Sequence, residues 1–330
     1  MLTNLLKEVS RSFYLTLRVL PAKVRTQIGL AYLLARATDT IADTEILPVA
    51  ERLSALQTLR DRILGRSDSL LNFGEIARHQ GSAGERVLLE RCEDAIGILA
   101  RQSTADQVVI RAVLETITSG QELDLTRFAT ASADHIMALN NEAELDDYTY
   151  RVAGCVGEFW TRICRAHLFP GARLDDELLM SNGIRFGKGL QMVNILRDIP
   201  ADLRQGRCYL PLTLLNQAGL TPQALLDPAS EPRLRPGYDR YLELAQSHLR
   251  AGWEYTNSLP WNQARVRLGC AWPVLIGLKT IDRLRSGKVL DASLRIKVTR
   301  PEIRNLMLRS VLLYPLPGQW RKMSSSQPAR

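Results

Sequence analysis

The sequence predicts an all-α protein. Aromatic residues make up only 6% of the 330 residues, and no stretch keeps the apolar–polar alternation of a half-buried strand. Apolar residues instead recur at helical spacing, and two of the helical stretches carry pairs of aspartates. Because the composition does not shift along the chain, we predict one domain over residues 1–318 and a disordered, basic tail over residues 319–330.

The predicted helices follow one another from the N-terminus. Apolar spacing and turn-forming residues place them at residues 1–20, 22–44, 50–64, 86–101, 104–128, 146–168, 175–199, 238–257, 262–286 and 301–315. Pro200 is expected to bend or end the seventh helix, because proline lacks a backbone donor. Four prolines predict an irregular connection over residues 218–237. Small residues such as Gly154 and Gly157 allow another helix or an apolar ligand to come close.

The helix before Pro200 divides into a polar and an apolar face. Gln191, Asn194 and Asp198 fall at i, i+3 and i+7, and Asp202 extends the row by one turn. Apolar residues cover most of the remaining surface, which is typical of a buried helix. Carboxylates on such a helix are costly unless something pairs with them, and a bound cation would supply that partner.

A second stretch repeats this arrangement. Tyr32, Arg36, Asp39 and Asp43 fall at i, i+4, i+7 and i+11 within an apolar run. Each stretch therefore offers a D-x-x-x-D pair with an arginine nearby. Carboxylate oxygens are suitable ligands for Mg²⁺, and arginine forms bidentate hydrogen bonds with phosphate. One such pair is usually a solvated helix face, whereas two pairs in apolar helices indicate a site for a diphosphate and Mg²⁺.

Charge and composition exclude several classes. The net charge of +8 suits nucleic acid, an anionic membrane surface or a polyanionic substrate. The basic residues are dispersed and no nucleic-acid motif is present, so we expect no nucleic-acid partner. No apolar run reaches the length of a transmembrane span. Five cysteines without metal spacing, and a start unlike a signal peptide, favour a cytoplasmic protein, with peripheral membrane contact left open.

These motifs resemble the squalene/phytoene synthase family, the head-to-head prenyl transferases. The resemblance extends from about Ser10 to about Met307 and is carried by residues 10–13, 32–43, 148–157, 191–202 and 206–211. It implies an all-α isoprenoid synthase fold with a central cavity between two aspartate-rich helices. It also implies a squalene synthase that joins two farnesyl diphosphates through presqualene diphosphate and reduces the product with NADPH.

The resemblance assigns roles to individual residues. Tyr148 would lie beside the reacting carbons. Mg²⁺, or Mn²⁺ in its place, would be held by Asp39, Asp43, Asn194, Asp198 and Asp202. The diphosphate would be bound by Ser10, Arg11, Ser12, Tyr32, Arg36, Gln191, Asn194, Arg197 and Arg207. The sequence has no G-x-G-x-x-G after a strand, so NADPH would be held by scattered basic residues, namely Arg11, Arg36, Arg197, Arg295 and Lys297.

Several alternatives stay open. Within the family, the reaction could stop at presqualene diphosphate, or give dehydrosqualene or phytoene without reduction. Ala42 stands where squalene synthases often carry an acidic residue, whereas the helix holding Leu278 and Lys279 lacks a tyrosine typical of the carotenoid branch. Some relatives are assembly factors without catalysis, but those have generally lost the acidic pairs that this chain keeps.

Overall fold

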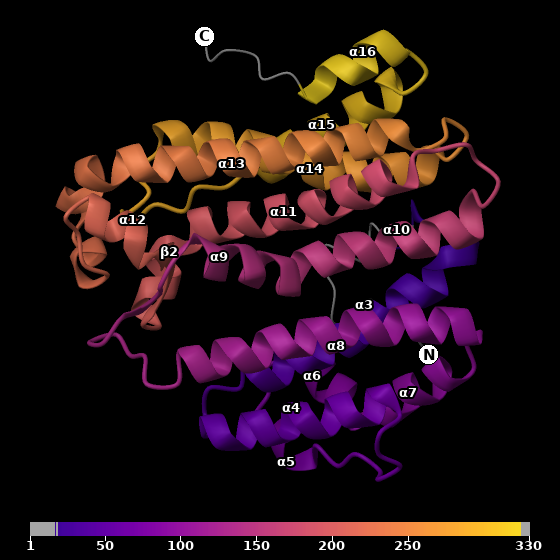
Figure 1. Cartoon of the computed structure of the whole chain (residues 1–330), viewed down its shortest axis with the longest axis horizontal. Coiled ribbons are helices and arrows are strands. Elements are labelled where there is room, and N and C mark those ends of the chain that lie inside the picture. The colour runs from indigo at the N-terminus through magenta and orange to yellow at the C-terminus, as the bar shows by residue number, and fades with distance from the viewer. Residues whose placement is uncertain (1–16, 18, 325–330) are drawn as a thin grey trace. The chain divides into compact units, whose positions relative to one another are not determined.

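The computed structural model describes residues 17 and 19–324, and the regular secondary structure of this part of the chain is almost all helix, with two short strands (Figure 1). The predicted all-α class is therefore confirmed. The chain forms two compact units: Met1–Ala129 with Phe159–Gly171, and Thr130–Glu158 with Ala172–Arg330. Ser10, Arg11 and Ser12 lie outside the described residues.

The first unit is built around one apolar helix. Helix α3 contacts α8, α4, α7 and α6, and Leu30, Leu33 and Leu34 on it are fully buried. The single helix predicted over residues 86–101 is divided in two at Arg91. The helices of this unit are α3 (Ala22–Ala42), α4 (Val49–Leu64), α5 (Gly74–Arg78), α6 (Ala83–Glu90), α7 (Cys92–Ala100) and α8 (Thr104–Arg127).

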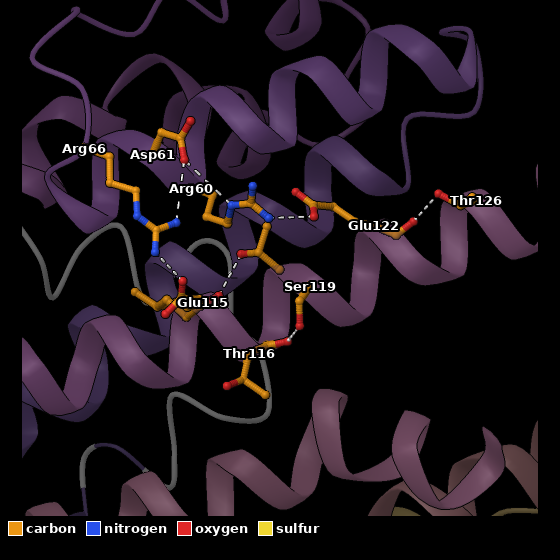
Figure 2. Close-up of polar contacts among 10 residues, drawn as sticks. Arg60, Asp61, Arg66, Glu115, Thr116, Ser119, Glu122 and Thr126 are labelled. Atoms are coloured by element: carbon orange, nitrogen blue, oxygen red, sulfur yellow. Dashed lines mark hydrogen bonds and ion pairs between the residues drawn. The ribbon is translucent and has the colours of Figure 1, made fainter. Parts of the chain in front are cut away.

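Ion pairs fix α4 against α8. Figure 2 shows Arg60 of α4 reaching Glu122 of α8 at 2.6 Å, and Arg66 beyond the end of α4 reaching Glu115 at 2.5 Å. Glu115 and Glu122 are two helical turns apart, so they mark one face of α8. The neighbouring face of α8 meets α3.

The second unit holds the remaining elements apart from most of α10. Helix α13 lies along α11, and α14 packs on α13 (Figure 1). The elements are β1 (Met137–Leu139), α9 (Glu142–Thr149), a π-helical turn (Tyr150–Gly154), α10 (Cys155–Leu168), α11 (Asp176–Arg204), β2 (Arg207–Pro211), α12 (Leu212–Gln217), the 3₁₀ turns Gln223–Leu226, Pro228–Ser230 and Lys322–Ser324, α13 (Glu231–Ser258), α14 (Ala264–Ser286), α15 (Arg300–Leu313) and α16 (Pro317–Arg321). Most of α10, from Phe159 onward, belongs to the first unit.

Two glycines bring the α9–α10 segment into direct contact with α11. A Cβ on Gly157 would lie 1.9 Å from the carbonyl oxygen of Gly183, and one on Gly187 would lie 2.1 Å from that of Ala153. Both distances are far inside van der Waals contact, so only glycine fits. The small residues of this segment therefore admit another helix.

Helix α11 does not end at Pro200. It continues to Arg204, so the expectation that the helix could end at Pro200 is wrong. Pro200 cannot donate to the carbonyl of Leu196, four residues earlier, but the buried hydroxyl of Tyr238 donates to that oxygen at 3.0 Å. This substitute donor satisfies the carbonyl that the proline leaves without a partner in the helix. Asp202 consequently lies on the same helix as Asp198, one turn further on.

Two other expectations need correction in the second unit. Helix α13 begins at Glu231, inside the predicted irregular connection, with Pro232 in its first turn, where the missing donor costs nothing. The disordered tail predicted over residues 319–330 is wrong for residues 319–324. Trp320 is fully buried, stacks on Trp253 at 5.3 Å, and donates to Asn257 at 2.9 Å. Residues 325–330 lie outside the described part of the chain.

Candidate functional site

The first acidic face lies on α3. Tyr32, Arg36, Asp39 and Asp43 follow one side of the helix, as the spacing predicts. Burial, and then the charge of Asp43, raise the pKa of Asp39 to about 6. Arg36 and a hydrogen bond from Gln121 lower it again, but only in part. At neutral pH this carboxylate is therefore ionised at a free-energy cost, which a nearby cation would remove.

Arg36 is fixed by an acidic partner on α6. Its terminal nitrogen donates to the carboxylate of Glu85. Burial lowers the pKa of Arg36, but the hydrogen bond and the charge of Glu85 outweigh it and leave the pKa raised. Because a guanidinium has five N–H donors, this pair orients the side chain and leaves capacity for an anionic ligand.

Gln121 of α8 was not predicted as a site residue. Its side chain is 8% exposed, its amide nitrogen donates to Asp39, and its buried amide oxygen has no hydrogen-bond partner among the described residues. The sequence did contain a signal. Leu114, Thr118 and Gln121 share one face of α8 by helical spacing, and all three are buried, so an amide occupies a core position of this helix.

The second acidic face lies on α11. Arg197 makes a bidentate pair with Asp198, with Nε to Oδ1 at 2.9 Å and Nη2 to Oδ2 at 2.5 Å. This pair raises the pKa of Arg197 despite partial burial, and the charge of Asp202 adds to it. Asn194 donates to Gln191 at 3.4 Å. The opposite side of the helix is buried, as expected, through Met192, Val193, Ile195, Leu196 and Ile199.

A short parallel strand pair connects α9 with the end of α11. Met137 pairs with Arg207 and Ala138 with Cys208, directly after the turn that follows α11. On these elements Tyr148 and Tyr209 stack, with ring centroids 4.7 Å apart and planes at 21°. Both rings are at least nine-tenths buried. The stack forms a firm aromatic surface in the unit that carries Asp198 and Asp202.

The remaining predicted residues are placed as follows. Arg295 and Lys297 lie on the exposed loop between α14 and α15, where the carbonyl of Lys297 accepts from Arg283. The structure thus groups the four α3 residues in the first unit. It groups Tyr148, Gln191, Asn194, Arg197, Asp198, Asp202 and Arg207 in the second.

The donor set of each face suits a hydrated Mg²⁺. Among the described residues no three histidine, cysteine, aspartate or glutamate side chains gather as a ready cage. Mg²⁺ instead takes one or two protein carboxylates and fills its other positions with water and phosphate oxygens. The costly charge on Asp39 and the unpartnered amide oxygen of Gln121 are features that such an ion would satisfy.

A family model described as squalene/phytoene synthase matches residues 6–302. The chain belongs to the squalene/phytoene synthase family. The predicted resemblance is confirmed.

Individual relatives are distant. The chain is 30% identical to a presqualene diphosphate synthase of Rhodopseudomonas palustris, covering 68% of this chain and 63% of the relative. It is 28% identical to a bifunctional lycopene cyclase/phytoene synthase of Colletotrichum graminicola, covering 86% and 45%. The chain thus spans about half to two thirds of these relatives. It is 25% identical to a 15-cis-phytoene synthase of Enterobacter agglomerans, covering 77% and 76%.

Solved structures show the same fold. The complex of TcSQS with the ligand E5700 has a TM-score of 0.78 at 24% identity, covering 98% of this chain and 88% of that one. A dehydrosqualene synthase in complex with a ligand has a TM-score of 0.66 at 18% identity, covering 95% of both chains. The isoprenoid synthase fold predicted from the sequence is therefore confirmed.

Proposed function

We propose that the protein is a squalene synthase. It condenses two farnesyl diphosphates head-to-head through presqualene diphosphate and reduces the product to squalene with NADPH, in a Mg²⁺-dependent reaction. The observation that carries the proposal is the pair of D-x-x-x-D faces on α3 and α11, each with an arginine oriented by a carboxylate. Family membership supplies the substrate class.

The acidic faces serve the diphosphate leaving group. Asp39, Asp43, Asn194, Asp198 and Asp202 would hold Mg²⁺, which when bound neutralises charge on the leaving oxygens. Arg36 and Arg197 add charge-assisted hydrogen bonds, with Tyr32, Gln191 and Arg207 as further ligands. Ser10, Arg11 and Ser12 are proposed for the same role. Donors fixed before the reaction stabilise the developing negative charge without reorganising.

The stacked tyrosines would contact the hydrocarbon part of the substrate. Loss of diphosphate leaves an allylic cation, which the faces of aromatic rings attract. The ring of Tyr148 is fixed by Tyr209 and largely excluded from water, so its face can stabilise positive charge where water is kept away. We propose Tyr148 as the residue that steadies the reacting carbons.

The reduction separates the two candidate functions. NADPH would be held by Arg11, Arg36, Arg197, Arg295 and Lys297, which carry the positive charge that its phosphates need. The alternative is a synthase that stops at presqualene diphosphate, or a dehydrosqualene or phytoene synthase. The similarity to the Rhodopseudomonas palustris protein supports this alternative.

Product analysis decides between them. The purified protein is incubated with farnesyl diphosphate and Mg²⁺, with and without NADPH, and the lipids are identified by mass spectrometry. Squalene formed only with NADPH supports the proposal, and presqualene diphosphate or dehydrosqualene under both conditions supports the alternative. Phytoene from geranylgeranyl diphosphate would point to the carotenoid branch. Failure to consume any prenyl diphosphate would refute both.

The substrate and product are lipids, so we further propose that a cytoplasmic protein works in contact with a membrane surface. No helix in the described part of the chain is long and apolar enough to span a bilayer. Contact would therefore involve one face of the protein.

A further inference from the structure

Helix α15 presents an apolar row to solvent. Leu308 is 59% exposed, Leu312 is 63% exposed and Val311 is 49% exposed, and Leu316 just beyond the helix is 46% exposed. Leu308 and Leu312 are one helical turn apart, with Val311 beside them, so the side chains form one continuous patch. We call these four residues the α15 patch. Adjacent exposed aliphatic residues on one helix mark an interaction site more often than scattered ones do.

The opposite side of α15 is firmly attached. Ser310 is fully buried and accepts a hydrogen bond from the indole of Trp272 on α14 at 2.9 Å. A capping box between Thr299 and Glu302 fixes the start of the helix. The α15 patch is therefore held outward by a rigid helix and cannot turn inward to hide its leucines.

Basic residues flank the patch. Relative to buried Ser310, helical geometry puts Leu308 and Leu312 near the outermost line, with Arg304 on one side and Arg309 on the other. Both arginines are exposed, as are Arg321 and Lys322. Glu302 is the one acidic residue between positions 300 and 324, and it is already paired with Lys279 at 2.9 Å and with Arg283 at 2.6 Å.

The apolar row and its flanking arginines indicate what binds to the α15 patch. An apolar line bordered by arginines is the arrangement of a helix that lies in the plane of a membrane interface, with the aliphatic side chains among the acyl chains and the guanidinium groups among the headgroups. A second copy of the chain would bring the same positive charges against these, and the two faces would repel. An anionic surface attracts them.

We propose that α15 and the following turn dock the protein on an anionic lipid bilayer, with Leu308, Leu312 and Val311 inserted and Arg304 and Arg309 on the headgroups. The docking is reversible and weakens with salt, since several of its contacts are electrostatic. It does not depend on which isoprenoid the enzyme makes.

Vesicle co-sedimentation tests the proposal. The full chain is mixed with vesicles of phosphatidylcholine alone, or of phosphatidylcholine with phosphatidylglycerol. We expect binding to the anionic vesicles, with at least about tenfold weaker binding for the double variant Leu308→Ser/Leu312→Ser. The double variant Arg304→Glu/Arg309→Glu should lose its preference for anionic over neutral vesicles.

Matched controls separate this surface from general stickiness. Leu70 and Val108 of the first unit are 79% and 62% exposed. The double variant Leu70→Ser/Val108→Ser should bind anionic vesicles like the unchanged protein. Circular dichroism and consumption of farnesyl diphosphate in detergent should be normal for all three variants, which keeps the docking test separate from the proposed activity.

Three results would overturn the proposal. The first is no binding of the unchanged protein to anionic vesicles. The second is equal binding by the Leu308→Ser/Leu312→Ser variant. The third is a dimer in analytical ultracentrifugation that the same variant abolishes, which would identify a second copy as the occupant of the α15 patch.

Discussion

Replacing Asp39 by asparagine should make the metal-free protein more stable at neutral pH. Asparagine has nearly the same shape and keeps an oxygen that can accept from Gln121. It removes the negative charge that desolvation at this half-buried position and the charge of Asp43 make unfavourable. If removing the charge of Asp39 stabilises the metal-free protein and also abolishes activity, the carboxylate serves to bind a cation and not to stabilise the fold.

The magnitude follows from the pKa. Asp39 has its pKa raised from 3.8 to about 6, a shift of about two units. Each unit corresponds to about 1.4 kcal/mol, so the ionised side chain costs up to about 3 kcal/mol of stability. The folded state binds the proton more tightly than the unfolded state does. Stability is therefore lost as pH rises from about 4 through about 6, and the full loss applies above about pH 7.

Urea unfolding at pH 4 and pH 8, with a chelator present, measures this difference. Asp39→Asn should exceed the unchanged protein by up to about 3 kcal/mol at pH 8, and by little at pH 4. Added Mg²⁺ should stabilise the unchanged protein and should leave the stability of Asp39→Asn unaltered. Asp198→Asn is the matched control, because it breaks the pair with Arg197 and should destabilise the protein by about 0–1 kcal/mol.

The reasoning is refuted if Asp39→Asn is no more stable than the unchanged protein at pH 8 with the chelator. It is also refuted if the difference between the two proteins is the same at both pH values, because the gain would then not come from the charge.

Two further predictions concern single contacts. Gln121→Met should weaken Mn²⁺ binding, followed by electron paramagnetic resonance, by about tenfold or more, because a ligand-orienting hydrogen bond to Asp39 is lost. Gln27→Met is its control, because Gln27 is equally buried and donates to Asp106, away from the acidic face of α3. The Gln27→Met variant should bind Mn²⁺ with unchanged affinity. An equal loss of affinity in both variants would contradict the proposed role of Gln121. Tyr238→Phe should cost about 1–3 kcal/mol in urea unfolding by leaving a buried carbonyl without a donor. Adding Pro200→Ala to Tyr238→Phe should restore most of that stability, and no recovery would show that the hydroxyl does not replace the missing N–H.

Local patterns explain what the sequence could predict. The positions of Tyr32, Arg36, Asp39 and Asp43 on one face follow from helical spacing alone, and so does the row from Gln191 to Asp198. The five cysteines are buried thiols, as their number and spacing indicate. These features need no knowledge of distant partners.

Tertiary partners explain what the sequence could not predict. Pro200 continues its helix because Tyr238, far along the chain, supplies a donor. Trp320 is ordered because it stacks on Trp253 and donates a hydrogen bond to Asn257, although its neighbours in sequence are polar and basic. Gln121 becomes a site residue only because α8 lies against α3.

The central claim is that both acidic faces act on the departing diphosphate. Its most direct test is the rate of inorganic diphosphate release from farnesyl diphosphate in a single turnover with saturating Mg²⁺, for the unchanged protein and for Asp39→Asn and Asp198→Asn. Each variant should be slower by about 10²-fold or more with normal circular dichroism. A near-normal rate in either variant would show that its acidic face takes no part in the reaction.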